Sequence, residues 1–418
     1  MLDIRYIREH PEEVQEKAKQ KGYDPDKVER LLEVDKYRKD ITLKSEELRR
    51  TINAASEEFK TRKPNETEKA DVRHFRELLK QDEKELKDYE NEYQELIREI
   101  PNIFPDSPDT PLGGEEANRE EKKWGKAEAK DVKDHLAWAE ERGLLDFERG
   151  AKVAGNKFYF VKGALVELEF AVLQLGLKLA KEAGFEPMLV PHLVKSNVID
   201  GAGFTAKSAD EKQIYKIEGE DLNLIATAEI PLTGYHADEV LQESDLPKLY
   251  AGYSPAYRME AGAYGKHSKG LYRVHQFNKL ELYVFCKPGD SEKWHQKLLE
   301  LEEKICQELE LPYRVVRIAA GDLGAPAYKK YDVEYWSPVD KAYRELMSVS
   351  NVTDYQARRL NIRYKTADGK NEFVHTLNGT AAAMSRITIA LVENHQDKSG
   401  KVAIPKALQP YMHGQETL

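Results

Sequence analysis

Arginine and carboxylate side chains occur together at three places in the second half of the sequence, and these residue types can bind anions. Arg258 stands two residues before Glu260, Arg344 stands directly before Glu345, and Arg386 lies in an otherwise apolar run. A guanidinium group can clamp a phosphate or a carboxylate through two parallel hydrogen bonds, and a β-strand fixes where that clamp points. Taken singly, each place is better explained by a structural ion pair. Only their combination predicts a site for an anionic substrate.

Three other features could carry chemistry, but their spacing or their isolation argues against a functional role. Residues 262–268 contain two glycines and a lysine, but only two residues separate the glycines and histidine follows the lysine. A phosphate-binding P-loop needs four intervening residues and then Ser or Thr. His275 could act as a general base, although an isolated histidine is more often a structural hydrogen-bonding group. Cys286 and Cys306 supply neither a disulfide framework nor a cysteine-rich zinc site, so no zinc is expected.

The composition indicates a multidomain globular protein. The 418 residues correspond to two or three domains at about 150 residues each. A net charge of −10 argues against binding nucleic acid by overall charge, while leaving room for a local basic stripe. The mean hydropathy of −0.70 predicts that no helix spans a membrane. Because the first ten residues contain no apolar signal-peptide core, we expect a cytoplasmic protein without membrane association.

Two long helices are predicted before the candidate site. From residue 26 to residue 99, apolar residues recur in steps of three and four, and only Pro64 interrupts the pattern. The similar lengths of the two helices and their short connection predict an antiparallel coiled-coil arm, about 50 Å long at 1.5 Å per residue. Its exposed faces carry many lysines, arginines and glutamates. The segment alone is best explained as a solvated coiled coil, and the alternative is a rod that reaches a phosphate backbone.

A different organisation follows the arm. Four prolines between residues 101 and 111 mark a linker, so we divide the chain into an N-terminal domain of residues 1–105 and a second domain of residues 106–418. Strands and helices do not alternate regularly in the second domain, which favours an α+β fold around an antiparallel sheet. The predicted strands are 158–161, 280–285, 313–318 and 333–336, and the predicted helices are 165–181, 291–309 and 381–394.

In combination and in this order, the motifs resemble the seryl-tRNA synthetases of the bacterial type, a family of class II aminoacyl-tRNA synthetases. The resemblance covers essentially the whole chain, arm included. Motif one ends in residues 185–191, motif two spans 257–285 and motif three spans 377–394. The residues that carry the resemblance are 227–229, 258–260, 274–277, Glu281, 343–348, 378–380 and Arg386.

The resemblance implies the class II synthetase fold, an antiparallel sheet flanked by helices and preceded by the coiled-coil arm. It also implies a two-step serine–tRNA ligase reaction. L-Serine and ATP form seryl-adenylate and pyrophosphate, and the serine then passes to the 3′ end of tRNA(Ser). Mg²⁺ accompanies the ATP, because the reaction brings a carboxylate against a polyanion. The resemblance leaves tRNA(Sec) open as a second acceptor.

The family's site residues carry over to matching positions of this sequence. Arg258 is implied to bridge the serine carboxylate and the α-phosphate, and Arg386 to hold the γ-phosphate, with Glu345 as the third catalytic residue. The implied ATP site consists of Arg258, Met259, Glu260, Val274, Glu345, Leu346, Met347, Ser348 and Arg386, with Glu345 and Ser348 also binding Mg²⁺. The implied serine pocket consists of Thr227, Ala228, Glu229, Glu281 and Thr380, without a division between ammonium and hydroxyl partners.

The family also implies a homodimer in which the arm of one subunit serves the active site of the other by contacting the tRNA backbone. Two segments depart from the family pattern. Residues 266–270 read Lys-His-Ser-Lys-Gly where Arg-Asp-Thr-Arg-Gly is usual, so the guanidinium forks are replaced by lysines. Residues 201–207 replace the usual Gly-Thr-Gly with Gly-Ala-Gly. Neither departure removes an implied catalytic group.

Three alternatives are less consistent with the sequence. A paralogue that delivers its aminoacyl-adenylate to a carrier protein would lack the arm, which is complete here. A non-catalytic RNA-binding protein would be expected to lose groups such as Arg258, Glu281 or Arg386, and all of them are present. A scaffold protein would explain residues 26–100 and nothing after them. The sequence therefore favours the tRNA-charging enzyme.

Overall fold

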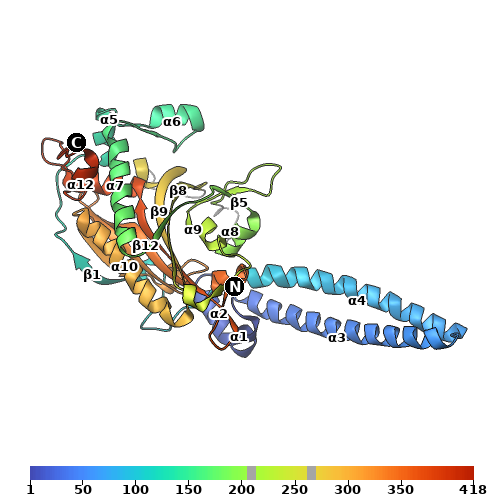
Figure 1. Cartoon of the computed structure of the whole chain (residues 1–418). Helices are drawn as coiled ribbons and strands as arrows, with labels where there is room; N and C mark the ends of the chain where they lie inside the picture. The colour runs from blue at the N-terminus through green and yellow to red at the C-terminus, as the bar shows by residue number, and fades with distance from the viewer. Residues whose placement is uncertain (205–212, 261–269) are drawn as a thin grey trace. The chain divides into compact units, whose positions relative to one another are not determined.

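The computed structural model describes residues 1–204, 213–260 and 270–418, which form two units, Met1–Pro101 and Asn102–Leu418 (Figure 1). Two features of the sequence fall outside the described residues: positions 266–269 of the lysine-containing segment and positions 205–207 of the Gly-Ala-Gly segment. Within the described ranges, no helix combines the length and the apolarity needed to cross a bilayer.

The first unit contains the predicted helical arm. Short helices α1 (Ile4–Glu9) and α2 (Pro11–Gln20) precede α3 (Asp26–Thr61) and α4 (Glu66–Glu99), which pack along each other. Ion pairs Arg38–Glu90 and Arg49–Glu83 fix their antiparallel direction. The turn between the helices follows from the sequence. Helix α3 ends before Pro64, and Asn65, the N-cap of α4, forms a capping box with Glu68 that satisfies backbone N–H groups at the start of α4.

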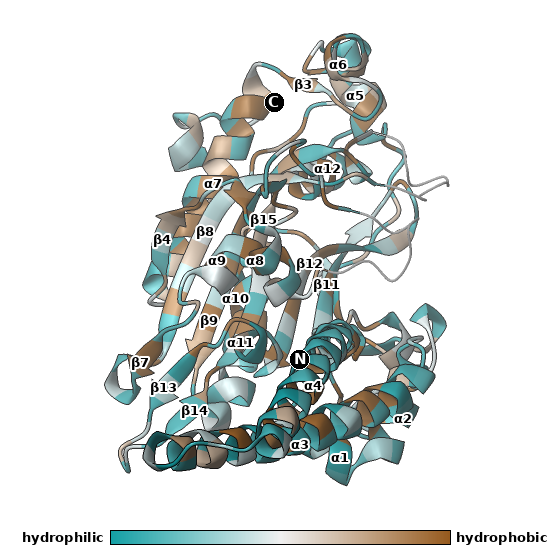
Figure 2. Cartoon of the chain, turned by 90° about the vertical axis from the view of Figure 1, so that its right-hand side faces the viewer, coloured by the Kyte–Doolittle hydropathy of each residue, from teal (hydrophilic) through white to brown (hydrophobic). Residues whose placement is uncertain are grey.

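The packing between α3 and α4 is most extensive at the base of the arm, near α1 and α2. Asp35 is buried and forms ion pairs with Arg8 at 2.7 Å, Arg38 at 3.2 Å and Lys39 at 3.3 Å. Arg38 also lies 4.0 Å from the centroid of the Tyr93 ring. Figure 2 colours most of α3 and α4 as hydrophilic, which agrees with a single apolar seam per helix. The base of the arm is therefore held by packing and by paired charges.

The second unit is built on an eight-stranded sheet. Its order is β1 (Arg119–Trp124), β10 (Tyr313–Arg317), β11 (Lys329–Ser337), β12 (Ala342–Thr353), β15 (His375–Ala383), β9 (Gln276–Cys286), β8 (Lys248–Tyr257) and β4 (Glu186–Leu189). Neighbouring strands are antiparallel except β4 and β8, which are parallel. The α+β prediction with an antiparallel sheet is confirmed.

Helices cover both faces of this sheet (Figure 1). On one face, α7 (Ala164–Glu182), α10 (Ser291–Glu308) and α12 (Met384–His395) form the main core with Leu280, Leu282 and Val284 of β9. On the other face, α8 (Ser196–Ala202), α9 (Glu229–Gly234) and α11 (Tyr355–Arg359) pack with Tyr283 and Phe285. Because strand side chains alternate between faces, the odd-numbered residues of β9 face this second, more open side. Lys279 and Glu281 are among them.

Smaller elements complete the unit. They are α5 (His135–Glu141), α6 (Phe147–Ala154), β2 (Leu145–Asp146), β3 (Phe160–Val161), β5 (Leu193–Val194), β6 (Asn223–Leu224), β7 (Val240–Gln242), β13 (Arg363–Lys365), β14 (Asn371–Phe373) and the 3₁₀ turn η5 (Gly270–Tyr272).

Two predicted boundaries are wrong. Residues 381–383 were expected to begin a helix, but β15 continues to Ala383, which pairs with Lys279 of β9, and α12 starts at Met384. Alanine is compatible with a helix as well as with a strand, and here pairing with β9 makes these residues part of the strand. The strand expected at 158–161 is reduced to Phe160–Val161, which pairs only with the two residues of β2.

Candidate functional site

Four residues from three segments meet on the face of the sheet that α8, α9 and α11 cover. Thr227 precedes α9, Glu229 begins it, Glu281 lies in β9, and Thr380 of β15 pairs with Glu281 in register. A β-bulge directly after Thr380 shifts the register of β15 and re-aims its side chains. All four residues are buried, and the Thr227 hydroxyl donates a hydrogen bond to Glu281 Oε2 at 3.0 Å. The pocket thus combines two carboxylates with two hydroxyl groups.

The structure adds Lys279 to this pocket, a residue that the sequence analysis missed. Its ammonium forms a buried ion pair with Glu281 and lies 3.4 Å from the Thr227 hydroxyl. The sequence did hold a signal. Lys279 and Glu281 are the charged residues of an otherwise largely apolar strand, and their spacing of two puts them on one face.

Glu229 has neutral partners instead. Gln356 and Asn378 donate amide hydrogen bonds to Glu229 Oε1 at 2.9 and 3.0 Å. Gln356 also accepts hydrogen bonds from Tyr283 and Thr376, so its orientation is fixed. The sequence analysis did not identify Gln356 as a site residue. The residues around it in the sequence do not indicate that a side chain of the short helix α11 contacts the start of α9.

The two carboxylates differ in their electrostatic environment. The pKa of Glu229 is raised to about 7, because burial and the negative charge of Glu281 together outweigh the opposing effect of Lys279. Glu229 therefore exchanges its proton near neutral pH. A cationic group placed beside it would favour its charged form.

A second cluster lies next to the first and contains the arginines. Arg386, at the start of α12, donates to the backbone oxygen of Glu345 at 2.8 Å and to its carboxylate at 3.0 Å. Partial burial alone would raise the pKa of Glu345, but the positive charges of Arg386 and Lys330 lower it to about 2. The Arg258 guanidinium donates to Ala226 O at 3.3 Å and lies 5.1 Å from the centroid of the Phe277 ring. Two guanidinium groups, each held by a backbone oxygen, thus belong to this cluster.

The other residues implied by the resemblance lie around this cluster in different ways. Glu260 forms an ion pair with Arg273 at 3.3 Å, and Val274 is buried just before β9. Met259 is exposed. Ser348 pairs with Asp332 across β11 and β12. The side chains of Leu346, Met347 and Ala228 do not point into this cluster, because the first two belong to the main core and Ala228 to the core of the other face.

The acidic side chains of the site offer few ligands for a metal ion. Within the described ranges, no group of three or more His, Cys, Asp or Glu side chains could hold a metal ion. Glu345 and Ser348 offer a carboxylate and a hydroxyl on β12. Mg²⁺ is commonly held by one or two carboxylates together with substrate phosphates, so these residues fit a metal that arrives with a phosphate-bearing ligand.

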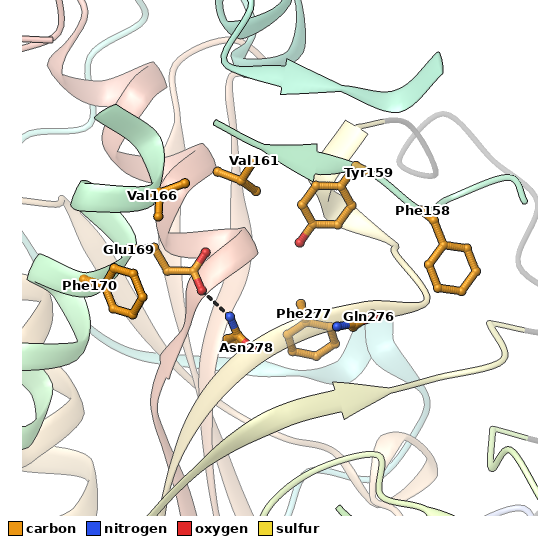
Figure 3. Close-up of a pocket in the computed structure, with 9 residues that line it drawn as sticks. All are labelled: Phe158, Tyr159, Val161, Val166, Glu169, Phe170, Gln276, Phe277 and Asn278. Atoms are coloured by element: carbon orange, nitrogen blue, oxygen red, sulfur yellow. Dashed lines mark hydrogen bonds between the residues drawn. The ribbon is translucent and has the colours of Figure 1, made fainter. Parts of the chain in front are cut away.

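A pocket of about 260 Å³ opens at the N-terminal end of β9 (Figure 3). Asn278 donates to Glu169 at 2.5 Å in this pocket, and burial raises the pKa of Glu169. Phe277 forms part of the wall and also lies beneath Arg258. The pocket is lined by Phe158, Tyr159, Val161, Val166, Glu169, Phe170, Gln276, Phe277 and Asn278.

Comparison with known proteins gives consistent matches over the whole chain. Residues 1–104 match the seryl-tRNA synthetase N-terminal domain, and residues 213–395 match the tRNA synthetase class II core domain (G, H, P, S and T). The serine–tRNA ligase of Dictyoglomus turgidum is 46% identical over 99% of this chain and 98% of its own length.

Solved structures give the same result. The seryl-tRNA synthetase of Pyrococcus horikoshii, complexed with ATP, matches with a TM-score of 0.92 at 39% identity, over 100% of this chain and 99% of that chain. The cytoplasmic serine–tRNA ligase of Naegleria fowleri, in complex with AMP, matches with a TM-score of 0.86 at 32% identity, over 100% and 98% of the two chains.

Proposed function

This chain belongs to the seryl-tRNA synthetase family, and from that premise we propose how its residues carry out serine–tRNA ligation. It activates L-serine with ATP and transfers the serine to the 3′ end of tRNA(Ser). In the first step a serine carboxylate oxygen bonds to the α-phosphorus of ATP, and the bond to the β-phosphate bridging oxygen breaks to release pyrophosphate. In the second step a terminal ribose hydroxyl attacks the serine carbonyl carbon and AMP leaves.

The observation that supports this proposal most directly is the buried acid and hydroxyl pocket beside two arginines. Because Lys279 already neutralises Glu281, we assign the serine ammonium to Glu229 and the serine hydroxyl to Thr380, Thr227 and Glu281. Alanine would leave these buried hydrogen-bonding groups unpaired, which supports discrimination of about 10⁴-fold. Threonine must be rejected by size, which is a weaker means of selection.

The arginine cluster is assigned to ATP. Arg258 would bridge the serine carboxylate and the α-phosphate, and Arg386 would hold the γ-phosphate. Val274 and Glu260 would contact adenine, which we place on the Phe277 ring because aromatic rings stack favourably on nucleic-acid bases of every kind. Mg²⁺, held by Glu345 and Ser348 together with the ATP phosphates, would offset the charge that builds up in the transition state.

The N-terminal domain is assigned to the tRNA, and we include a homodimer in the proposal. The arm would contact the backbone of tRNA(Ser), and tRNA(Sec) would follow if it presents the same shape, because such contacts do not read bases. A second copy of the chain is supported by large apolar side chains that the single chain leaves in water. Phe170 of α7 is 57% exposed, and Leu189 of β4 is 84% exposed.

The proposed activity is tested by serine-dependent exchange of pyrophosphate into ATP, measured for each of the twenty amino acids with Mg²⁺. We expect exchange with serine, alanine slower by about 10⁴-fold, and no exchange beyond background with large amino acids. Exchange with a different small amino acid would assign the protein to another acceptor class. A folded protein that exchanges with none would contradict the proposal.

The affinity for serine should depend on pH through Glu229. Its pKa of about 7 means that the serine ammonium must displace a proton at lower pH. The KM for serine is therefore expected to rise about tenfold from pH 8 to pH 6, since each pH unit below the pKa costs about a factor of ten. Exchange rates at varied serine and saturating ATP measure this. In Glu229→Gln the KM should be high and independent of pH, and a flat profile in the unchanged protein would refute the assignment.

A further inference from the structure

His135, at the start of α5, joins two parts of the active site that are distant in sequence. Its ring is buried, with Nδ1 3.0 Å from Glu393 Oε1 and Nε2 3.2 Å from the backbone nitrogen of Leu271. A backbone N–H can only donate, so Nε2 must accept, and the proton must therefore sit on Nδ1 and be donated to Glu393. The imidazole is neutral and held in one tautomer.

One end of this connection is the chain segment that enters β9. Gly270 has a φ of 60°, and a Cβ atom at this position would collide with Nε2 of His135, so only glycine fits here. Tyr272 packs edge-on against the imidazole at 5.4 Å between centroids, and its hydroxyl lies 2.9 Å from that of Tyr335. The 3₁₀ turn η5 is thus held by His135 on one side and by β11 on the other.

The other end of the connection is α12, which begins two residues before Arg386. Glu393 is buried near the end of this helix, and its second oxygen accepts a hydrogen bond from Ser337 at 2.9 Å. The helix is rigid between these positions, so an anchor at Glu393 also fixes the direction of the Arg386 end. Val274 lies two residues after the end of η5 and two residues before the start of β9.

We propose that His135 is a positioning residue for ATP, which ties the segment 270–274 to α12 so that Val274 and Arg386 hold one nucleotide in register. The inference rests on the proposed assignment of these two residues to ATP. His135 is not among the residues assigned to ATP or to serine. Its effect should therefore appear in the binding of ATP and not in the binding of serine, whose pocket is built from Thr227, Glu229 and Glu281.

The test separates the two hydrogen bonds of the ring. In His135→Asn the amide can still reach Glu393 but loses the acceptor for the Leu271 N–H, whereas in His135→Gln the longer side chain can supply that acceptor. We expect His135→Asn to raise the KM for ATP about tenfold, the usual cost of an unpaired buried donor, with the KM for serine changed less than twofold. His135→Gln should restore at least half of the lost ATP affinity.

His295 provides the matched control. It is equally buried and donates to Val349 O at 3.2 Å, but it lies on α10, away from η5. His295→Gln should change the two KM values to the same extent, if at all. Equal changes in both KM values for His135→Asn, or no change in a folded protein, would overturn the proposal. If His135→Asn does not fold, Tyr272→Phe serves instead, because it removes only the hydroxyl that contacts Tyr335. It must raise the KM for ATP more than the KM for serine, by a smaller factor than expected for His135→Asn.

Calorimetric binding of ATP in the absence of serine keeps this inference distinct from the proposed reaction. Wild-type protein that binds ATP but does not catalyse exchange would contradict the proposed function and leave the His135 comparison measurable. Wild-type protein that catalyses exchange, with unchanged ATP affinity in folded His135→Asn, would contradict this inference alone.

Discussion

Replacing Arg258 by lysine is expected to slow serine-dependent pyrophosphate exchange by about 10³-fold, the effect of losing a main contact to charge that develops in the transition state. Lysine keeps the positive charge but presents a point charge instead of a planar fork, so it cannot bridge the carboxylate and the α-phosphate at once. The native side chain is fixed by Ala226 O and by the Phe277 ring, and the shorter reach of a lysine ammonium satisfies neither. Steady-state exchange rates at saturating serine and ATP measure the loss.

Arg314 supplies the control for this substitution. Like Arg258, it lies over an aromatic ring, 4.9 Å from the Tyr343 ring centroid, and its polar partner is the carboxylate of Glu334. It belongs to β10 and has no role in the proposed site. Arg314→Lys should leave exchange within about twofold, as for a partly exposed ion pair. If Arg258→Lys lost less than tenfold in a folded protein, the bridging role would be wrong.

A shortened arm should separate the two steps of the reaction. Removing residues 44–85 and joining the ends by a short glycine–serine turn leaves exchange within about twofold, because the adenylation residues all lie in the second unit. Charging of tRNA(Ser) should fall by about 10³-fold or more, since each lost phosphate contact also removes its counterion-release contribution. Exchange and aminoacylation are measured on the same preparation.

The cut is placed so that the base of the arm stays intact. The buried Asp35 with Arg8, the Tyr37–Tyr89 stack and the Arg38–Glu90 pair all remain. Rising salt should weaken charging by the full-length protein steeply and leave its exchange rate nearly unchanged. Loss of exchange in the folded, shortened protein would show that the arm also supports adenylation, and charging at the normal rate would show that it does not bind the tRNA.

Much of the architecture could be predicted because it depends on local pattern. The two arm helices follow from their three-and-four spacing and from Pro64, and family membership, which is confirmed, follows from motifs in a fixed order. The strand at 381–383 could not be predicted, because alanines suit a helix, and pairing with Lys279 decided the outcome. The sequence pattern of one segment does not show which strand that segment will pair with.

The site was predicted in its residue types more completely than in its connections. The resemblance indicated Glu229 and Glu281 as a pair, but their difference in proton affinity depends on Lys279 and Gln356, which reach them from other segments. Such contacts between distant parts of the chain leave no periodic signal. For the same reason the position of His135 against the entry to β9 could not be predicted, since His135 lies far upstream of every motif.

The uneven burial along the arm has a consequence for its motion. On α3 the last buried side chain is Ile52, and on α4 the first is Val72, so every residue from 53 to 71 is at least partly in contact with water. Backbone amides near the turn should therefore exchange with deuterium by local fraying, while those around Leu31 and Ile97 should exchange only on wider opening. The arm would therefore be rigid at its base and more flexible near the turn, so that its end could adapt to surfaces of differing curvature.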